Sequence, residues 1–345
     1  QYVDLSEKIK TDIDIDLLKR TPSSYLGSCR YKLPEVNEDK AVYEKIFKTL
    51  EDLEVKYFFY IGGNDSMDTI KKLSDYANLV NSDIKFMGVP KTIDNDLAVT
   101  DHTPGYGSAA KYIAATMKEI IRDGLVYDYP TITIVEIMGR NAGWLTAAAA
   151  LAKGEDCEGV DMIYLPEKVF DIDKFMARVK SLSEQGRSMV IAISEGIKVA
   201  DGRYVFELSD HVEFVDAFGH KQLAGSAKFL ANKIGSELGI KTRAIELSTM
   251  QRCAAHMTSR TDITEAFNVG GAAVKAAFEG ATYMCITETH DVHDIANVEK
   301  KIPLEWITDD DYVTDDLIHY IRPLIQAELS PIMVDGLPRH LNVNF

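Results

Sequence analysis

Short runs of β-branched and aromatic residues alternate along this chain with longer segments whose apolar residues recur at helical spacing. The short runs predict strands at residues 57–61, 84–89, 131–137, 189–194 and 283–287. The longer segments predict helices at residues 66–77, 108–121, 142–151, 172–185 and 226–238. This rhythm is typical of parallel sheets covered by helices on both faces. The expected fold class is therefore α/β.

The two ends of the chain carry less regular patterns. The first 50 residues hold a polar amphipathic segment, the turn GSCR at 27–30, and a helix expected from about 38 to 52. Residues 309–316 are acidic and predict a solvated loop, which precedes a last helix at 316–328. A chain of 345 residues is long enough for two domains, each with its own core.

The balance of charges limits the kinds of partner. The formal net charge is −16, and no run rich in lysine and arginine offers a footprint for a nucleic-acid backbone, so no nucleic-acid partner is expected. A small phosphorylated substrate stays open, because an acidic protein can hold a local basic pocket. No apolar run approaches a membrane span and no signal peptide is visible, so no membrane association is expected. The four cysteines lack CxxC spacing and are typical of reduced thiols in a cytoplasmic protein.

The stretch PKTIDND at 90–96 carries the strongest chemical signal. It places Lys91, Asp94 and Asp96 directly after the apolar run 84–89. A lysine suits an anionic phosphate, and two carboxylates two residues apart suit proton abstraction beside a metal ion. A polar loop whose aspartates cap the next segment would not explain why a lysine shares the same strand end. The stretch therefore indicates phosphoryl transfer.

A second strand end carries the sequence GGNDS at 62–66. Backbone N–H groups at the start of a helix can bind phosphate oxygens, although an ordinary strand-to-helix turn would look the same. Asp65 is unusual beside a nucleotide, since an unscreened like-charge contact at about 4 Å costs about 4 kcal/mol at an effective dielectric near 20. Ligands gather at the carboxyl ends of parallel strands, so both turns are expected to belong to one site.

At this point the chain resembles the phosphofructokinase family. PKTIDND is similar to that family's catalytic motif in its lysine-containing form. The sequences MGR at 138–140, SEG at 194–196 and QR at 251–252 are similar to its sugar-phosphate motifs, and GSCR at 27–30 to its phosphate-contacting turn. The five matches follow the family order and span residues 25–340. The resemblance implies two doubly wound α/β domains with mainly parallel sheets and the active site in the cleft between them.

The resemblance implies a role for each residue around the transferred group. Asp94 corresponds to the general base that takes the proton of the sugar 1-hydroxyl. Thr92 would hydrogen-bond the transferring group or the sugar phosphate, and Asp96 would hold geometry and charge near the base and the metal. Arg140 would stabilise charge on the phosphoryl group, as an arginine fork can bind phosphate at two points.

The same resemblance implies the contacts to the sugar phosphate. Glu195 would accept ring hydroxyls, and Arg252 would bind the 6-phosphate. Arg243 corresponds to an arginine that the family donates across a subunit interface, so the working unit would be a homodimer or homotetramer. The full implied set for the sugar substrate is Thr92, Asp94, Met138, Gly139, Arg140, Glu195, Arg243, Thr249 and Arg252.

Two residues favour inorganic diphosphate as the donor. Family members that use ATP carry glycine where this chain has Asp65 and Lys91, whereas the diphosphate-dependent branch carries aspartate and lysine. Asp65 would fill the space of an α-phosphate and ribose, and Lys91 would stabilise the transferring phosphoryl or the leaving phosphate. Gly63 and Arg30 are the other implied donor contacts. The expected reaction converts fructose 6-phosphate and diphosphate reversibly into fructose 1,6-bisphosphate and phosphate.

Several positions depart from the family pattern. The implied cofactor is Mg²⁺, but Asn64 stands where the family usually has an aspartate ligand, so Asn64 and Asp65 together are the expected metal ligands. Thr249 replaces a histidine or tyrosine that binds the sugar phosphate, and Thr131 replaces a second interface arginine. Nothing before Gly27 resembles the family's opening strand and glycine-rich turn, which predicts an N-terminally incomplete chain.

The implied donor domain comprises residues 1–105 and 252–345, and the sugar domain residues 106–251. Two alternatives remain open, namely an ATP-dependent enzyme of the same family and a non-catalytic regulatory subunit. Intact Asp94, Asp96 and Arg140 argue against the second. Some nucleotide and lipid kinases share the GG-acid turn but lack PKTIDND and MGR.

Two further segments carry local predictions. Residues 218–223 are expected to form a mobile loop near the sugar. His290 and His293 have HxxH spacing, but they are expected to lie in a solvated turn and not to bind zinc.

Overall fold

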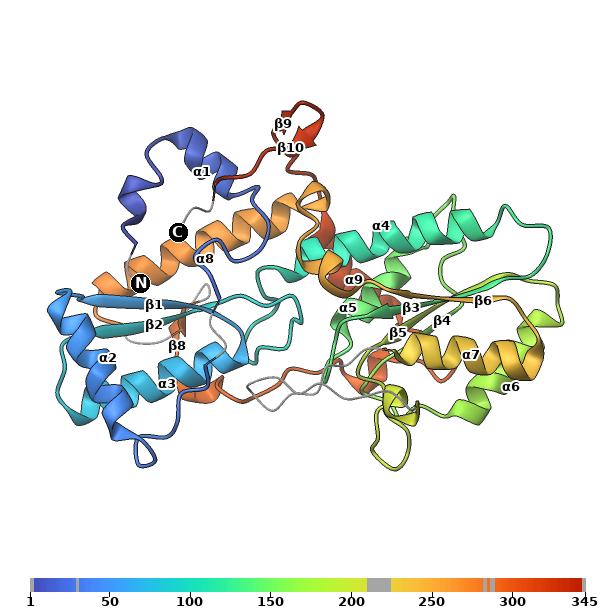
Figure 1. The fold of residues 1–345 in the computed structure, drawn as a ribbon, viewed down its shortest axis with the longest axis horizontal. Coiled ribbons are helices and arrows are strands. Elements are labelled where there is room, and N and C mark those ends of the chain that lie inside the picture. Colours follow the sequence, from blue (N-terminus) through green and yellow to red (C-terminus); the bar gives the residue numbers. More distant parts are fainter. Residues whose placement is uncertain (1–2, 29–30, 210–224, 282–283, 286–288, 343–345) are drawn as a thin grey trace.

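The computed structural model describes residues 3–28, 31–209, 225–281, 284–285 and 289–342. Two sheets lie side by side along the long axis, each with its own set of helices (Figure 1). The helices are α1 Asp12–Leu18, α2 Lys40–Asp52, α3 Asn64–Leu79, α4 Tyr106–Gly124, α5 Trp144–Ala147, α6 Ile172–Ser183, α7 Ser226–Leu238, α8 Arg260–Phe278 and α9 Asp315–Ile321. The strands are β1 Tyr57–Gly62, β2 Lys85–Pro90, β3 Ile132–Ile137, β4 Met162–Tyr164, β5 Met189–Ser194, β6 Thr242–Glu246, β7 Met284–Cys285, β8 Thr289–His290, β9 Met333–Val334 and β10 Leu337–Pro338.

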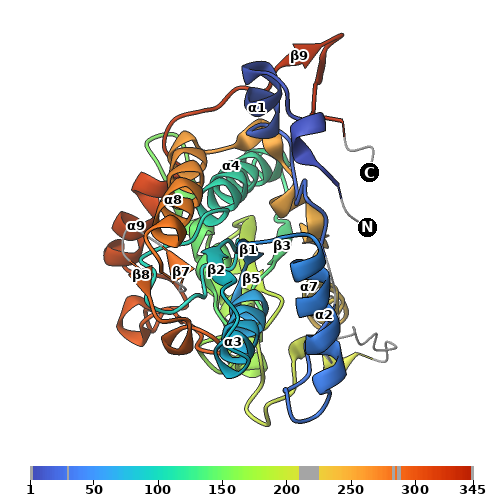
Figure 2. The same ribbon diagram turned by 90° about the vertical axis from the view of Figure 1, so that its left-hand side faces the viewer.

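The first sheet is a parallel pair of β1 and β2, in a register that sets Tyr57 against Lys85. Successive residues of a strand point to opposite faces, so β2 has to be covered on both. Phe86 packs with apolar side chains of α2 and α3, whereas Met87 and Val89 pack against the alanines of α8. In the end-on view, α3 and α8 accordingly lie on opposite sides of β2 (Figure 2).

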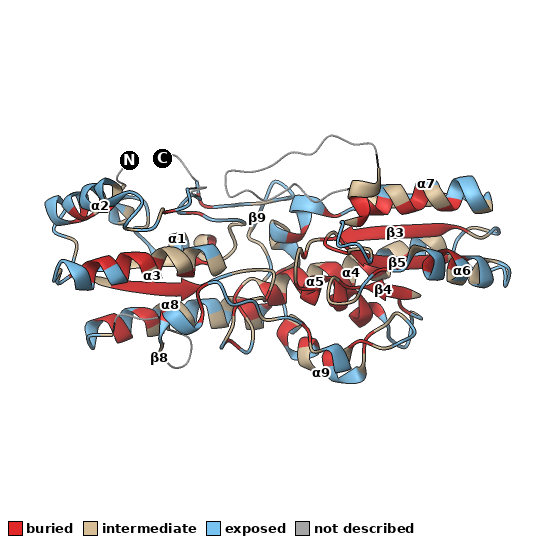
Figure 3. Cartoon of the chain, turned by 90° about the horizontal axis from the view of Figure 1, so that it is seen from below, coloured by how far each residue is buried: buried red, intermediate tan, exposed pale blue. Residues whose placement is uncertain are grey.

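The second sheet has four parallel strands in the order β4-β5-β3-β6. Every residue of β3 and β5 is buried, as a strand covered on both faces requires (Figure 3). Val135 and Ile137 face α4 and α5, whereas Ile132 and Ile134 face α6 and α7. The expected α/β class and the mainly parallel sheets are confirmed. The antiparallel pairs within the described residues are β7 with β8 and β9 with β10.

The chain returns to the second sheet after α8. Ile302, Ile307 and Leu317 belong to the same core as α4 and α5. The acidic stretch 309–316 is only partly solvated, which corrects the expectation for it. Asp309 is exposed, but Asp311 is half-buried, and its carboxylate accepts a hydrogen bond from the Tyr164 hydroxyl at 3.2 Å. No helix in the part of the chain that the structure describes is long and apolar enough to cross a membrane.

The regular elements follow the sequence pattern closely. The strands expected at 57–61, 84–89, 131–137 and 189–194 are confirmed within one residue at each end. The helix expected at 142–151 is the short α5 continued by a 3₁₀ turn, Ala148–Ala152, and the helix expected at 316–328 ends at Ile321 before a 3₁₀ turn, Arg322–Ile325. Pro323 lies in that last turn and has no N–H to continue an α-helix. Of the strand expected at 283–287, residues 284–285 form β7, and the rest lies outside the described residues.

The longest element that the pattern missed is α8. Gly270 and Gly271 lie in its middle and read as a helix break in the sequence. A start signal was nevertheless present, because Ser259 stands three residues before Asp262 and accepts its backbone N–H. Strands β4 and β6 were also missed, and β6 matters because it leads to the sequence QR at 251–252.

Candidate active site

The carboxyl ends of β1 and β2 bring two of the motifs into contact. The Lys91 backbone N–H donates to the carbonyl oxygen of Gly62 at 3.0 Å. A Cβ placed on Gly63 would lie 3.4 Å from the Thr92 Cβ, which is ordinary van der Waals contact. The expectation that GGNDS and PKTIDND share one site is therefore supported by direct contact between the two turns.

The loop from β2 to α4 is folded back on itself. Its backbone pairs Thr92 with Gly105, and the Thr103 hydroxyl donates to the Thr92 carbonyl at 2.9 Å. Asn95 is fully buried with a φ of 54°, a conformation that asparagine tolerates better than most residues. Its Oδ1 accepts the Thr103 backbone N–H at 3.0 Å. Asn95 thus forms the interior of the loop, and Asp94 and Asp96 on either side of it are half-buried.

The second sheet supplies three motifs from three neighbouring strands. MGR follows β3, SEG follows β5, and QR ends the 3₁₀ turn Ser248–Arg252 after β6. The Gly139 backbone N–H donates to Glu195 Oε1 at 3.3 Å, and the Met138 N–H donates to Gln251 Oε1 at 3.3 Å. A Cβ on Gly196 would lie 2.0 Å from the Arg140 carbonyl oxygen, so only glycine fits. The three motifs therefore form one packed unit.

Charges from both sheets meet at Asp94. Burial raises the pKa of the Asp94 carboxyl, and the cations Lys91, Arg140 and Arg252 oppose this increase. Burial, with a further contribution from Asp94, raises the pKa of Asp96 to about 6. Asp94 is thus within electrostatic reach of all three cations. The family resemblance had assigned Lys91 and Arg140 to the reacting centre and Arg252 to the 6-phosphate of the sugar.

The acids of the second sheet are also perturbed. Burial raises the pKa of Glu195 to about 8, with Asp94 and Glu136 adding to the increase. Glu136 on β3 was not predicted. Burial raises its pKa to about 7, although it accepts the Ala227 backbone N–H at 2.8 Å and the Gly225 N–H at 3.2 Å. Glu136 therefore fixes the start of α7 beside Glu195.

Asn64 carries the one observation that bears directly on a metal ion. Its Nδ2 lies 3.3 Å from Asp96 Oδ2 and 3.4 Å from the Asp96 carbonyl oxygen, two acceptors that identify this atom as the amide nitrogen. Its Oδ1 is buried and has no hydrogen-bond partner within the described residues. An amide oxygen without a donor suits a hard cation such as Mg²⁺. Asp65 is exposed on the first turn of α3, and no cluster of three acidic, histidine or cysteine ligands occurs in the described ranges.

Some predicted residues lie apart from this centre. Arg243 is near the start of β6, at the end opposite to the motifs, where it donates to the Tyr127 hydroxyl at 3.0 Å and lies 3.5 Å from Asp123. Thr249 is exposed on the same 3₁₀ turn as Arg252. Arg30 and the loop 218–223 lie outside the described residues.

Sequence reasoning missed one lysine that supports the loop. The Lys300 backbone N–H donates to the Asp96 carbonyl at 2.7 Å, and its Nζ donates to the Thr100 carbonyl at 3.2 Å. Burial lowers the pKa of Lys300 to about 8, and its ammonium group lies 4.9 Å from the ring centroid of Trp144. No local motif surrounds Lys300, so only the tertiary structure could identify it.

Two parallel α/β sheets whose strand ends gather paired carboxylates and three cations define a protein of the phosphoryl-transfer class. Residues 3–277 match the phosphofructokinase family, and the chain belongs to that family. Phosphotransferases of this family generally use a divalent metal ion.

Individual relatives agree with this assignment. The chain is 39% identical to the pyrophosphate–fructose 6-phosphate 1-phosphotransferase of Methylococcus capsulatus, over 95% of this chain and 81% of that protein. It is 41% identical to the protein of the same name from Xanthomonas campestris, over 95% of this chain and 82% of that protein. The solved pyrophosphate-dependent phosphofructokinase of Marinobacter aquaeolei superposes with a TM-score of 0.84 at 34% identity, covering 99% of this chain and 83% of that one.

The pKa of Glu195 leads to a stability prediction. Because the folded value is raised to about 8, the folded protein keeps a proton that the unfolded chain releases near its ordinary value of 4.5. The unfolding free energy should therefore fall as pH rises from about 4.5 to 8. Glu195→Gln has no such proton, so its Tm relative to wild type should rise by at least about 2 °C between pH 5 and pH 8.5.

Differential scanning fluorimetry at several pH values measures this change. The matched control is Glu305→Gln at an exposed glutamate, whose Tm difference from wild type should not follow pH in this way. A difference for Glu195→Gln that stays constant with pH would contradict the assignment.

Proposed function

We propose that this protein transfers a phosphoryl group reversibly from inorganic diphosphate to the 1-hydroxyl of fructose 6-phosphate, giving fructose 1,6-bisphosphate and phosphate. The observation that carries the proposal is the half-buried Asp94 surrounded by Lys91, Arg140 and Arg252. A base next to cations from both sheets is the arrangement that in-line phosphoryl transfer needs. The printed names of the most similar relatives describe the same reaction.

Asp94 is the proposed general base. Burial raises its pKa and makes it a better proton acceptor than an exposed aspartate, and the neighbouring cations oppose this increase. The Thr92 hydroxyl, which accepts the Asp94 backbone N–H at 3.1 Å, holds the base at the start of the loop. Arg140 and Lys91 stabilise charge on the phosphoryl group and the leaving phosphate. Asp96 keeps negative charge next to the base and Asn64.

The motifs of the second sheet bind the sugar phosphate. Glu195 bonds ring hydroxyls, and the Gly139 backbone N–H holds its carboxylate in place. The Met138 N–H holds Gln251, the residue before Arg252. Arg252 and Thr249 bind the 6-phosphate. Arg243 reaches the site of a neighbouring subunit, so the working unit is a homodimer or homotetramer.

The donor lies between the turns at the ends of β1 and β2, in contact with Gly63, Lys91 and Arg30. The exposed Asp65 carboxylate repels the extra phosphate of a nucleotide. Asn64 Oδ1 and Asp65 would hold Mg²⁺, which would supply positive charge to the donor.

The protein acts in the cytoplasm. Residues 1–105 and 252–345 form the donor domain, and residues 106–251 form the sugar domain. The active site lies in the cleft between the two domains. Residues 302–324 are part of the donor domain as bounded here, but they pack on the second sheet, which belongs to the sugar domain.

The direct test is a coupled assay with fructose 6-phosphate and Mg²⁺, in which diphosphate and ATP are offered separately. Activity with diphosphate alone supports the proposal. Activity with ATP alone keeps the family and removes the proposed role of Asp65, whereas no activity with either donor favours a regulatory subunit.

Asp94→Ser should reduce kcat by roughly 10²–10⁴-fold and leave KM for fructose 6-phosphate nearly unchanged, because the base acts in the chemical step. Steady-state kinetics in both directions measure this effect. Asp309→Ser, at an exposed aspartate outside the site, is the control. A kcat within about threefold of wild type would remove Asp94 as the base.

Asp65→Gly should lower the ratio of kcat/KM for diphosphate to that for ATP by at least about tenfold, since it removes both charge and volume. Asp65→Asn keeps the volume and removes the charge, so the two variants separate the causes. An unchanged ratio in both would mean that Asp65 does not select the donor.

Asn64→Leu should raise the Mg²⁺ concentration for half-maximal activity by roughly tenfold, because an uncharged ligand oxygen is lost. Asn64→Asp provides the comparison, since it restores an oxygen ligand. Magnesium titrations at fixed diphosphate measure the change, and equal titration curves for wild type and Asn64→Leu would exclude Asn64 as a ligand.

A further inference from the structure

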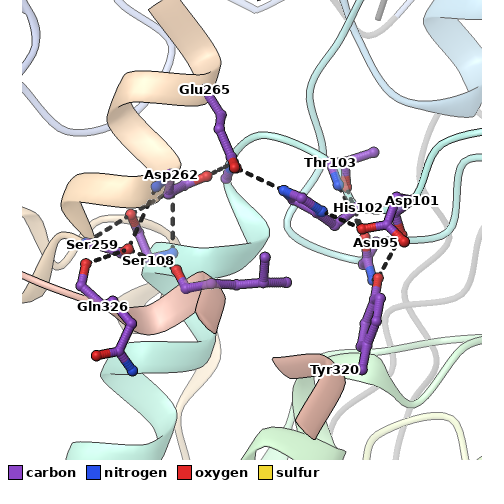
Figure 4. Close-up of polar contacts among 12 residues, drawn as sticks. Asn95, Asp101, His102, Thr103, Ser108, Ser259, Asp262, Glu265, Tyr320 and Gln326 are labelled. Atoms are coloured by element: carbon purple, nitrogen blue, oxygen red, sulfur yellow. Dashed lines mark hydrogen bonds and ion pairs between the residues drawn. The ribbon is translucent and has the colours of Figure 1, made fainter. Parts of the chain in front are cut away.

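The loop that carries Asp94 and Asp96 is held by a helix far away in sequence. This catalytic loop, residues 91–105, runs from the end of β2 to the start of α4. Its own hydrogen bonds involve Thr92, Asn95 and Thr103, and the Thr100 hydroxyl donates to the Leu97 carbonyl at 2.7 Å. Helix α8 faces the loop with two acidic side chains, Asp262 and Glu265 (Figure 4). Spaced three residues apart, they lie on one face of the helix.

Asp262 fixes the end of the loop. It is 5% exposed, and its carboxylate accepts the Gly105 backbone N–H at 2.7 Å and the Ser108 N–H at 3.2 Å. It also accepts the Ser108 hydroxyl at 2.5 Å. The donors are at the first turn of α4, where the helix dipole favours a negative charge. Asp262 therefore joins the start of α8 rigidly to the start of α4.

Glu265 holds the middle of the loop through His102. Its Oε2 lies 2.7 Å from His102 Nε2, and His102 Nδ1 lies 2.8 Å from Asp101 Oδ2. Both ring nitrogens face carboxylates, and only the doubly protonated imidazolium can donate to both. The same two carboxylates raise the pKa of His102 in opposition to burial. His102 is therefore the positive centre of a three-residue bridge between loop and helix.

The opposite side of the loop is held by α9. The Tyr320 hydroxyl lies 2.9 Å from Asn95 Nδ2 and donates to the Asp101 carbonyl at 2.5 Å. Lys300 also donates to the Asp101 carbonyl. The backbone of Asp101 is thus fixed from the α9 side and its carboxylate is tied to His102, so the loop is clamped between α8 and α9 (Figure 4).

We propose that Glu265 is a positioning residue for phosphoryl transfer, acting through His102 to hold the catalytic loop, and this rests on the function proposed above. Glu265 does not touch the reacting atoms. It restrains residues 101–105, whose hydrogen bonds to Asn95 and Thr92 set the position of Asp94. A displacement of the base by even about 1 Å can cost up to about 10²-fold in rate, which makes such a restraint important for catalysis.

The test compares Glu265→Ala, His102→Gln and the double variant with wild type. Alanine has the best helix propensity, so α8 keeps its stability. Glu279→Ala is the matched control, because Glu279 lies at the other end of α8 and pairs with the exposed Lys275 at 4.0 Å. Glu265→Gln keeps an acceptor for His102 and serves as the conservative variant.

Hydrogen–deuterium exchange provides a readout that does not depend on activity. Exchange of residues 92–105 should become about 3- to 10-fold faster in Glu265→Ala and His102→Gln, with no such change in Glu279→Ala. The double variant should exchange no faster than either single variant, because both break the same bridge. Glu265→Gln should fall between Glu265→Ala and wild type.

Steady-state kinetics give the second readout. In Glu265→Ala we expect kcat to fall about 3- to 30-fold while KM for each substrate changes by less than about twofold. Unchanged exchange of the loop, or losses of kcat that multiply in the double variant, would overturn the proposal. If wild type itself lacks activity with diphosphate, the proposed function fails, and the exchange data still decide whether Glu265 holds the loop.

Discussion

The arrangement around the candidate site is governed by the placement of two acids, Asp94 and Asp96, in a partly dehydrated environment. Burial favours the protonated form of each, and their mutual repulsion adds to this effect at Asp96. At Asp94 the opposing charges come from Lys91 on the same loop and from Arg140 and Arg252 on the second sheet. At Asp96 a hydrogen bond from Asn64 opposes the increase. Under the proposed function, Asp94 therefore has its three neighbouring cations only when the two sheets are held in a fixed relation, so the packing between them is a condition of the proposed chemistry.

The relative position of the two sheets is fixed by close packing between particular segments. The MGR and SEG turns approach so closely that a Cβ at Gly196 would overlap the Arg140 carbonyl oxygen, which sets the position of Arg140 relative to Glu195. On the other sheet, α8 packs on β2 with small alanine side chains. Its Asp262 carboxylate also accepts hydrogen bonds from the backbone at the start of α4. Since α4 belongs to the core of the second sheet, α8 and Asp262 connect the two halves of the molecule mechanically.

Local information predicted most of this arrangement. The strands β1, β2, β3 and β5 were predictable because each is a short apolar run that ends in a polar turn. The resemblance of the MGR and QR sequences to family motifs then indicated Arg140 and Arg252. The supports of the catalytic loop were not predictable in the same way. Asn95 supports the interior of the loop through hydrogen bonds with Thr103 and Tyr320, and Tyr320 is 225 residues away in the chain. Helix α8 was missed because two glycines interrupt its pattern, although the Ser259 cap marked its start.

Donor selection, under the proposed function, follows from repulsion as much as from attraction. The first turn of α3 offers N–H groups and a favourable dipole to any phosphate, so attraction alone would not discriminate between diphosphate and ATP. Asp65 sits on that same turn and faces solvent, where a negative charge penalises a donor that carries a further phosphate. Asn64, uncharged and joined to Asp96, leaves the local field less negative than an aspartate would. Under the proposed function, this combination would accept a small anion such as diphosphate and would disfavour the longer ATP through charge repulsion.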